Sequence, residues 1–303
     1  MAKYKDIKDD EIRVIGATKT KKSLSWVWML LVSLVSAGII VTLLFTFIGK
    51  DADSKAVLEP ELEMKDVPVV FEPSEQPTKT PEPVKWLGNY SDDSKSYTEH
   101  LKDSINDVAL DIYIPHNAVP ELMLGVPDIH DKSIILTTQA ADVRADNGKI
   151  VGAFVLNGKP LSWGLSKRGY CGIIDGKISI GVAENSPLFE EATEKGGYFF
   201  RQYPLVDNGV LVENEPKGKS VRKALCDRNG EIMVIMTKNP ESFHDFAQAL
   251  VDMKVDNAVY LVGSTSFGYF RDRYDHLAII YNKLRFGYKY ENFIVWKVKP
   301  VTE

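Results

Sequence analysis

The chain has 303 residues, of which 44% are hydrophobic, enough to form a sizeable core in one large domain or two small ones. Its formal net charge is −5, and acidic and basic residues intermix over most of the length. The sequence contains no basic stripe that could neutralise a row of phosphates, so we expect no nucleic-acid partner.

An apolar segment without charged residues runs from Leu24 to Ile48. At about 1.5 Å per residue it is about 37 Å long, which is enough to span a hydrocarbon core of about 30 Å. A cleaved signal peptide is the alternative, but its apolar region would be only about 7 to 15 residues long. We therefore predict a transmembrane signal anchor over residues 24–48.

The charges beside this segment predict its orientation. Basic residues precede it at Arg13, Lys19, Lys21 and Lys22. The positive-inside rule therefore places residues 1–23 in the cytoplasm and everything after Lys50 outside. We expect a single-pass protein of the inner or cell membrane, with its C-terminal domain periplasmic or extracellular. The exported part has one glycosylation sequon, Asn89-Tyr90-Ser91, and few cysteines, which favours a bacterial envelope over a Golgi-type location.

Residues 49–95 are rich in proline and charge. The prolines are Pro60, Pro68, Pro73, Pro77, Pro81 and Pro83. Such sequence favours an extended chain and does not form a core, so it predicts a stalk. A partner-docking tract is the alternative use, and the apolar patch Val67 to Phe71 could add to a sheet as an edge strand.

The folded domain is expected from residue 96 to 303. Its first half is rich in predicted strands: Val108 to Ile114, Ser133 to Thr138, Ile150 to Leu156, Cys171 to Ile174 and Lys177 to Val182. Asp175-Gly176 predicts a two-residue hairpin turn, and Asn157-Gly158 and Asn229-Gly230 mark further tight turns. These turns imply much antiparallel pairing.

The second half predicts a βαβ unit. A strand over Glu231 to Thr237 precedes a helix that Ser242 and Asp245 begin, and a strand over Ala258 to Val262 follows it. The helix has one apolar face, formed by Phe243, Phe246, Ala247, Leu250 and Val251. The two strands should be parallel. The predicted fold class is thus α+β, with a mixed, largely antiparallel sheet and at least one βαβ unit, after a transmembrane helix and a Pro-rich stalk.

Ligands tend to bind beyond the carboxyl ends of the strands in such a unit. Here these ends lead into Lys238 to Glu241 and Gly263 to Gly268. The sequence GSTSFG at Gly263 misses the spacing of the hydrolase elbow G-x-S-x-G, and the following FRDRY does not predict the helix that an elbow needs. We do not expect a serine hydrolase.

Neither a metal nor a cofactor is expected. The five histidines are scattered, and His244 lies on the polar side of the predicted helix. The two cysteines, Cys171 and Cys226, either form a disulfide or are separate core residues.

Three polar segments follow or flank predicted strands. The first, Thr137 to Gly148, carries Gln139, Asp142 and Arg144; the second, Gly196 to Gly209, carries Arg201, Gln202, Asp207 and Asn208; the third, Lys219 to Leu225, carries Arg222. Apolar neighbours flank Arg222, so its side chain is expected to point inward. It would then need an anionic partner, either a carboxylate of the fold or the phosphate of a ligand.

Taken in order, four segments resemble the phosphodiester glycosidase family. They are DNGKIVGAFVLNGKPLS, FFRQYPLVDNG, SVRKALCDRNGEIMVI and SFHDFAQALVDMKVDNAVYLVGSTS. The second resembles the family's aromatic-Gln-x-Pro-Leu-Leu stretch, the third its Arg-x-Ala, and the fourth its helix, strand and glycine loop. The resemblance covers roughly Asn106 to Trp296.

The resemblance implies hydrolysis of sugar-1-phosphodiesters by a mixed α and β fold. By position, Arg222 would hold the phosphate, and the glycine loop of Gly263, Ser264, Thr265 and Ser266 would form one wall. Gln139, Arg144, Arg201 and Asn208 lie in or beside the matching segments and are expected to contact substrate.

The chain departs from the family at two positions. Val262 stands where the family's Leu-Asp-Gly-Gly loop has its carboxylate, and Gln139 stands where an earlier loop has Asn. Glycoside hydrolysis generally needs a proton donor and a base or nucleophile. Asp142 and Asp207 are the candidate substitutes.

Two functions are therefore expected. The first is a membrane-anchored envelope protein that binds or hydrolyses a sugar-1-phosphodiester of a cell-envelope glycan. The alternative is a catalytically degenerate docking or structural module of the envelope. The sequence indicates no oligomeric state.

Overall fold

The computed structural model describes residues 84–89, 95–165, 167–264, 266–282 and 290–299. The predicted cytoplasmic tail, the signal anchor over 24–48 and the stalk up to residue 83 lie outside these ranges. Within them, no helix is long and apolar enough to cross a membrane. The membrane anchor therefore stays a prediction.

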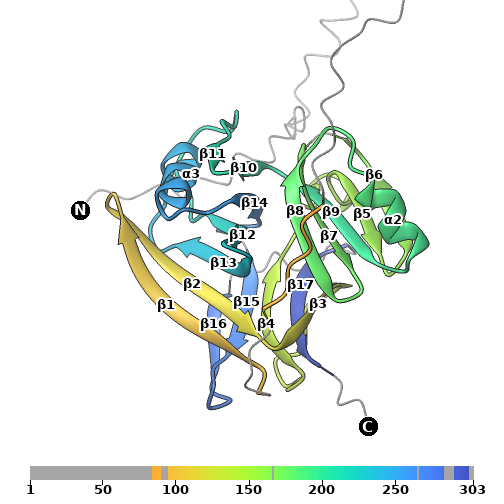
Figure 1. The fold of residues 1–303 in the computed structure, drawn as a ribbon, viewed down its shortest axis with the longest axis horizontal. Helices are drawn as coiled ribbons and strands as arrows, with labels where there is room; N and C mark the ends of the chain where they lie inside the picture. Colours follow the sequence, from red (N-terminus) through yellow and green to blue (C-terminus); the bar gives the residue numbers. More distant parts are fainter. Residues whose placement is uncertain (1–83, 90–94, 166, 265, 283–289, 300–303) are drawn as a thin grey trace, which may run out of the picture. The chain divides into compact units, whose positions relative to one another are not determined.

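The described residues of the domain form three sheets and two helices (Figure 1). The seven-stranded sheet has the order β1 (Tyr97–Ile105), β2 (Val108–His116), β13 (Glu231–Thr237), β12 (Lys223–Arg228), β14 (Asn257–Leu261), β10 (Pro204–Asp207) and β11 (Val210–Leu211). A five-stranded sheet has the order β16 (Leu277–Asn282), β15 (Phe267–Arg271), β4 (Ile134–Gln139), β17 (Asn292–Val298) and β3 (Ala118–Leu124). The other has the order β6 (Lys159–Trp163), β5 (Ala153–Leu156), β9 (Tyr198–Gln202), β7 (Gly169–Ile174) and β8 (Lys177–Val182). The helices are α2 (Leu188–Glu194) and α3 (Phe243–Asp252).

Every pair of neighbouring strands in these sheets is antiparallel. This confirms the predicted α+β class with largely antiparallel pairing. Asp175 and Gly176, which join β7 to β8, both have positive φ, as a type I′ hairpin turn requires. The same holds for Asn157-Gly158 and Asn229-Gly230, so the dipeptide signals located these turns.

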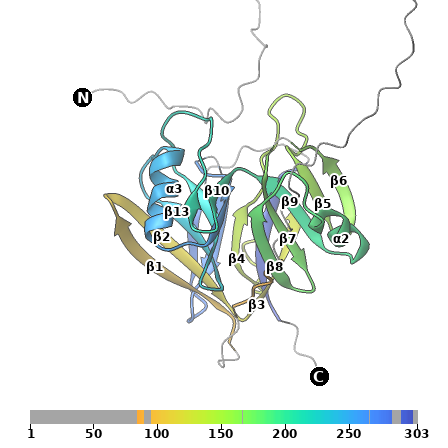
Figure 2. The same ribbon diagram turned by 45° about the horizontal axis from the view of Figure 1, so that its top comes forward.

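The three sheets share one hydrophobic core. It takes buried residues from the seven-stranded sheet (Tyr113, Leu225), from the sheet with β4 (Leu136, Trp296) and from the sheet with β9 (Phe154, Phe200). Helix α3 packs on the other face of the seven-stranded sheet, and α2 packs on the outer face of the sheet with β9 (Figures 1 and 2). Side chains along β12 therefore alternate between the two cores: Leu225 faces the shared core, while Ala224 and Cys226 face α3.

The predicted strand, helix and strand are present as β13, α3 and β14. Ser242 caps the helix, since its hydroxyl accepts a hydrogen bond of 2.9 Å from the Asp245 amide. Strands β13 and β14 both pair antiparallel with β12, so they run in the same direction with β12 between them. The βαβ unit is therefore split, because the tight Asn229-Gly230 turn places β12 directly beside β13.

The two cysteines are free thiols in different cores. Cys171 lies on β7 in the shared core, and Cys226 lies on β12 under helix α3. Burial raises the pKa of both thiols well above the ordinary range. Of the two alternatives left by the sequence, the structure contains the pair of separate core residues.

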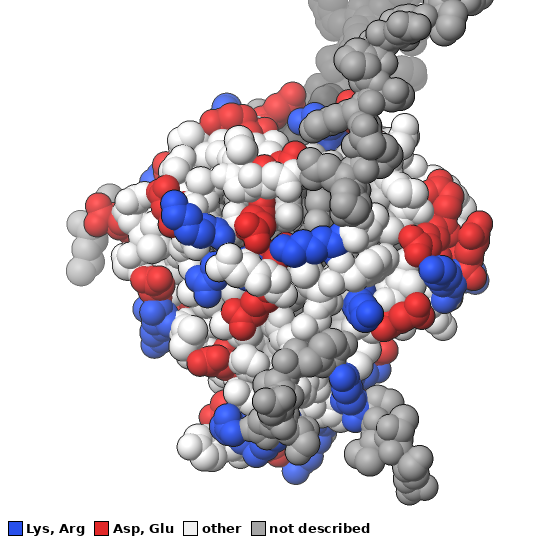
Figure 3. Space-filling view, in the orientation of Figure 1, with Lys and Arg blue, Asp and Glu red and all other residues white. Residues whose placement is uncertain are grey.

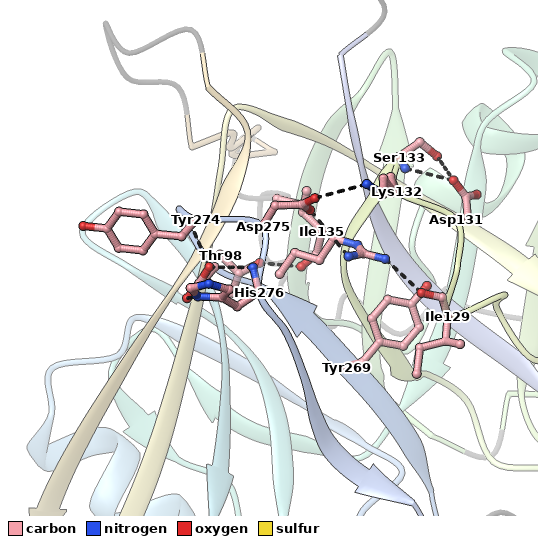
Figure 4. A network of polar contacts seen from close by, with 12 residues as sticks. Thr98, Ile129, Asp131, Lys132, Ser133, Ile135, Tyr269, Tyr274, Asp275 and His276 are labelled. Carbon is pink, nitrogen blue, oxygen red and sulfur yellow. Dashed lines mark hydrogen bonds and ion pairs between the residues drawn. The ribbon is translucent and has the colours of Figure 1, made fainter.

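A polar network fastens the connection between β3 and β4 to β15 (Figure 4). The Tyr269 hydroxyl donates to the Asp128 carbonyl at 2.8 Å, and the Arg271 guanidinium donates to the Ile129 carbonyl at 2.9 Å. Next to them, hydrogen bonds from Ser133 hold the pKa of the Asp131 carboxyl below its ordinary value. These contacts are internal to the fold and lie outside the polar segments that the sequence singled out.

Residues 84–89, which composition assigns to the stalk, bridge two of the sheets. Leu87 exchanges backbone hydrogen bonds with Ile178 of β8, at 2.8 and 3.0 Å. The Asn89 side chain accepts a hydrogen bond from the Ile232 amide at 2.8 Å and donates to the carbonyls of Pro115 and Ile232. The amide of the only sequon in the exported part is therefore occupied by the fold.

We predict that Asn89→Ala lowers the free energy of unfolding by about 1 to 3 kcal/mol, because it leaves partly buried backbone groups of β13 without partners. Urea unfolding of the full chain measures this change. Asn185→Ala, at an exposed position, is the matched control and should have little effect. Equal stability of the two variants would contradict a bridging role for this segment.

Candidate functional site

A buried ion pair lies where the connection after β4 meets the sheet that contains β9. The Lys167 ammonium contacts the Asp142 carboxylate and donates to the Gln202 amide oxygen at 2.7 Å. It also lies 4.2 Å from the centre of the Tyr203 ring. Asp142, Lys167 and Gln202 are all buried, and we call them the Lys167 cluster. Such burial of two charges is tolerated only when they are paired and further hydrogen-bonded, as they are here.

Arg201 holds the main chain around this cluster. Its guanidinium donates to the carbonyls of Lys167 and Ala183 at 2.9 Å and to that of Glu184 at 2.7 Å. Burial lowers the pKa of Arg201. Its Nε has no hydrogen-bond partner among the described residues, and the same is true of the Gln202 Nε2 and of Gln139 Oε1 at the end of β4. Unsatisfied groups of this kind mark places where water or a ligand would bind.

Two surface clefts flank the residues that follow β6. The first has a volume of about 560 Å³, and the exposed side chains of Arg144 and Lys149 contribute to its wall. The second, of about 510 Å³, includes Ser186, Phe189 and Arg201. Trp163 and Leu165 line both clefts.

The first cleft is connected to the Lys167 cluster through the main chain, and none of the three cluster residues lines its wall. Its wall includes Val151, whose amide donates to the Asp142 carbonyl at 2.8 Å. Three predicted site residues, Asp142, Arg144 and Arg201, are thus gathered around the Lys167 cluster and the two clefts.

A second buried lysine lies at the start of β12. Lys223 is fully buried, and its ammonium donates to the hydroxyls of Thr138 at 2.8 Å and Ser266 at 3.0 Å. The Ser266 hydroxyl in turn donates to the Gly263 carbonyl at 2.7 Å. Burial lowers the pKa of Lys223 to about 7. No carboxylate is among the contacts that the described residues make with this ammonium.

Arg222 points to the opposite side of the sheet. Its guanidinium donates to the carbonyls of Glu241 and Gly218, both at 3.0 Å, and lies 4.1 Å from the centre of the Phe243 ring. These contacts place the side chain against helix α3. Arg222 is buried, as expected of an inward side chain, but it enters the core under helix α3 and donates to carbonyl oxygens. The neighbouring residue, Lys223, is the cation that enters the shared core.

The glycine loop after β14 is tightly packed. A Cβ atom on Gly263 would lie 2.1 Å from the Val221 carbonyl oxygen, so no other residue fits at this position. Val262 is buried. Ser264 is partly buried beside it, and Thr265 lies outside the described residues.

Asp207 and Asn208 lie at the far end of β14 from the glycine loop. The Asn208 backbone amide donates a hydrogen bond of 3.1 Å to the side-chain oxygen of Asn257, the first residue of β14. Strand β14 has five residues, so Asn257 lies about 13 Å from Leu261, the last residue before the glycine loop. Because β10 runs antiparallel to β14, the end of β10 cannot reach the carboxyl end of β14.

The predicted site residues thus fall into separate places. Gln139, Asp142, Arg144, Arg222 and Ser264 do not line one cleft together among the clefts described above. Acidic and basic side chains intermix on the face in Figure 3, without a large area of one sign. Across the described ranges, no group of three or more His, Cys, Asp or Glu side chains could hold a metal ion.

Sequence reasoning missed both buried lysines. Lys223 could have been found, since strand alternation puts it on the same face as Leu225. Lys167 gives no such signal, because it lies between strands and pairs with a residue that is distant in the sequence.

No protein-family model matches the chain, and no curated protein matches it. Solved structures do match, at low similarity. One is the catalytic domain of zebrafish N-acetylglucosamine-1-phosphodiester alpha-N-acetylglucosaminidase auto-inhibited by pro-peptide, with 12% identity, a TM-score of 0.49, and coverage of 72% of this chain and 88% of that chain. Another is a hypothetical protein from Synechocystis, with 12% identity and a TM-score of 0.49, covering 72% of this chain and 64% of that chain.

We predict that Lys223 makes stability rise with pH. The folded-state pKa is about 7 and the ordinary value is 10.5, so between these values the unfolded chain binds more protons than the folded chain. The free energy of unfolding should then rise by up to about 1.4 kcal/mol per pH unit through this window. Lys223→Met removes the titration and should flatten this part of the profile.

Urea unfolding of the full chain at several pH values between about 6 and 10 measures this difference, in the window that the pKa shift defines. Lys102→Met, at an exposed position of β1, is the control and should keep the wild-type slope. Parallel profiles for wild type and Lys223→Met would contradict the lowered pKa.

Proposed function

We propose that the chain is a single-pass membrane protein whose external domain binds a phosphorylated glycan in the first cleft. The observation that carries this proposal is the pair of exposed cations, Arg144 and Lys149, in a cleft whose lining residue Val151 is hydrogen-bonded to the main chain of Asp142. The predicted signal anchor over residues 24–48 and the Pro-rich stalk would hold this domain at the outer face of the membrane.

The cations in the first cleft are suited to a phosphate group. Arg144 forms an ion pair of 3.3 Å with Asp146, and both side chains are substantially exposed. Exposed pairs contribute little free energy, so the guanidinium can exchange this partner for a phosphate at little cost. A planar guanidinium binds two phosphate oxygens at once, and the Lys149 ammonium adds a second positive charge.

Asp142 is the proposed catalytic group if the domain also hydrolyses its ligand. As a base, its carboxylate would take a proton from a water that attacks the anomeric carbon; as a nucleophile, it would bond to that carbon itself until water releases the sugar. In both cases the bond from the anomeric carbon to a phosphate oxygen breaks, and the products are the free sugar and a phosphomonoester. Gln139 has no part in this proposal, because its amide oxygen is buried and the residue does not line the first cleft. Asp207 and Asn208 have no part in this proposal because they lie at the other end of β14.

A protein-docking module of the envelope is the second candidate. It is favoured by the two positions that the family resemblance assigns to the chemistry, since Arg222 is packed against Phe243 and Val262 is an apolar residue in the core. A domain without glycan affinity would be expected to keep the fold and lose these groups.

We predict that Arg144→Ala with Lys149→Ala weakens binding of a GlcNAc-1-phosphate methyl diester by at least about tenfold, because the phosphate loses both cations. Calorimetric titration of the full chain in detergent measures the affinity. The matched control is Lys102→Ala with Arg273→Ala, which removes two exposed cations elsewhere. No binding by the wild-type chain, or equal loss in both double variants, would sink the proposal in favour of the docking module.

We also predict that Asp142→Asn abolishes any release of phosphomonoester from this diester, and that it lowers stability because the buried Lys167 ammonium loses its carboxylate partner, so turnover is compared at equal amounts of folded protein. Asparagine keeps the shape of the side chain and removes its charge. Turnover that survives in Asp142→Asn would exclude Asp142 as the catalytic group. Binding without turnover in the wild type would limit the domain to a binding role.

A further inference from the structure

Trp163 is a large aromatic side chain held at the surface between the two clefts. Its exposed fraction is 66%, and that of Leu165 is 64%. Most of the other large aromatic residues of the described domain are buried in its cores. Exposed tryptophan is unfavourable in water and is concentrated at binding surfaces, where its ring supplies contact area at a low cost in conformational entropy.

The chain around Trp163 is held firmly from below. Lys167 lies four residues after Trp163. Arg201 donates a hydrogen bond to its carbonyl, and Asp142 pairs with its ammonium. Gly164 packs against Gly152, and a Cβ atom on Gly164 would lie 3.2 Å from the Gly152 Cα. Gly152 in turn has a φ of +86° and leaves room for Arg201 beneath it. A surface aromatic on such a support is preorganised, so little entropy is lost when a ligand binds.

The two clefts on either side of Trp163 are amphipathic. The first combines Leu161 and Val151 with Arg144 and Lys149. The second combines Phe189 and Pro187 with Ser186 and Asn185. Apolar surface interleaved with a few polar groups is what a pyranose ring matches, because one face of the ring presents C–H groups and its rim presents hydroxyls.

Arg201 supports the wall of the second cleft from beneath. Its exposed fraction is 2%, and its Nη atoms donate to the carbonyls of Lys167, Ala183 and Glu184. Ala183 and Glu184 precede Asn185 and Ser186, which line this cleft. The guanidinium therefore fixes the main chain that presents the polar groups of the cleft to a ligand.

We propose that an anionic glycan chain of several sugar units lies across both clefts, with one ring stacked on Trp163. The first cleft binds a negatively charged unit through Arg144 and Lys149, and the second binds a neighbouring unit next to Arg201. This inference rests on the proposed function and extends it. It identifies the ligand as a glycan of several sugar units and assigns Trp163 as a specificity-determining contact.

The test compares oligogalacturonides of increasing length as anionic probes, titrated into the full chain in detergent. The tetramer should bind at least about tenfold more tightly than the monomer, since it reaches both clefts and the indole ring. Trp163→Ala should weaken binding of the tetramer about tenfold and change binding of the monomer by less than about twofold. Tyr274→Ala is the matched control because Tyr274 is also an exposed aromatic, at 77%, on the turn after β15.

Affinity that does not increase with length, or a Trp163→Ala variant that binds the tetramer like the wild type, would overturn the inference. So would neutral chitooligosaccharides that bind as tightly as the anionic probes of equal length. The failure of the proposed function looks different: the GlcNAc-1-phosphate methyl diester then fails to bind, whatever the oligogalacturonides do. Diester binding without any gain from length would overturn the glycan-chain inference alone.

Discussion

The proposed ligand site, which consists of the two clefts and Trp163, depends on the buried contact between Asp142 and Lys167. Removing two charges from water costs several kcal/mol for each ion, and the fold offsets this cost by pairing them and by adding the Gln202 amide and the Tyr203 ring. The pair joins the connection after β4 to the residues before β7, which belong to different sheets. The clefts are connected to this junction through Val151, which lines the first, and Arg201, which lines the second, so their geometry depends on the ion pair and on the Arg201 contacts beside it.

Strand alternation explains the second polar feature of the interior. Arg222 and Lys223 are consecutive, so their side chains leave opposite faces of the seven-stranded sheet. Arg222 packs against the start of helix α3, where it donates to two carbonyl oxygens and lies over the Phe243 ring. Lys223 enters the shared core, where only two hydroxyls meet it and burial lowers its pKa to about 7. The same alternation therefore turns one basic dipeptide into a helix anchor and a titrating core residue.

Local sequence patterns predicted the individual turns and helices better than they predicted which strands pair with each other. The turn dipeptides, the Ser242 cap and the apolar face of α3 are set by residues close in sequence, and the structure contains them all. The insertion of β12 between β13 and β14 depends on which strands pair, and the hydrophobic periodicity of the sequence does not reveal that pairing. The same limit applies to the site. Asp142 and Arg144 follow a strand end and were predicted together with Arg201, whereas Lys167, the partner that gathers them, is distant in sequence. Asp207 and Asn208 looked equivalent to these residues until strand direction placed them at the other end of β14.

A structure of the protein with a bound GlcNAc-1-phosphate methyl diester tests the central claim most directly, which is that the ligand site is the first cleft. The account predicts the phosphate within hydrogen-bonding distance of Arg144 and Lys149, with the Asp142 to Lys167 pair intact. A phosphate bound instead at Arg222, or at the Asp207 and Asn208 turn, would contradict it.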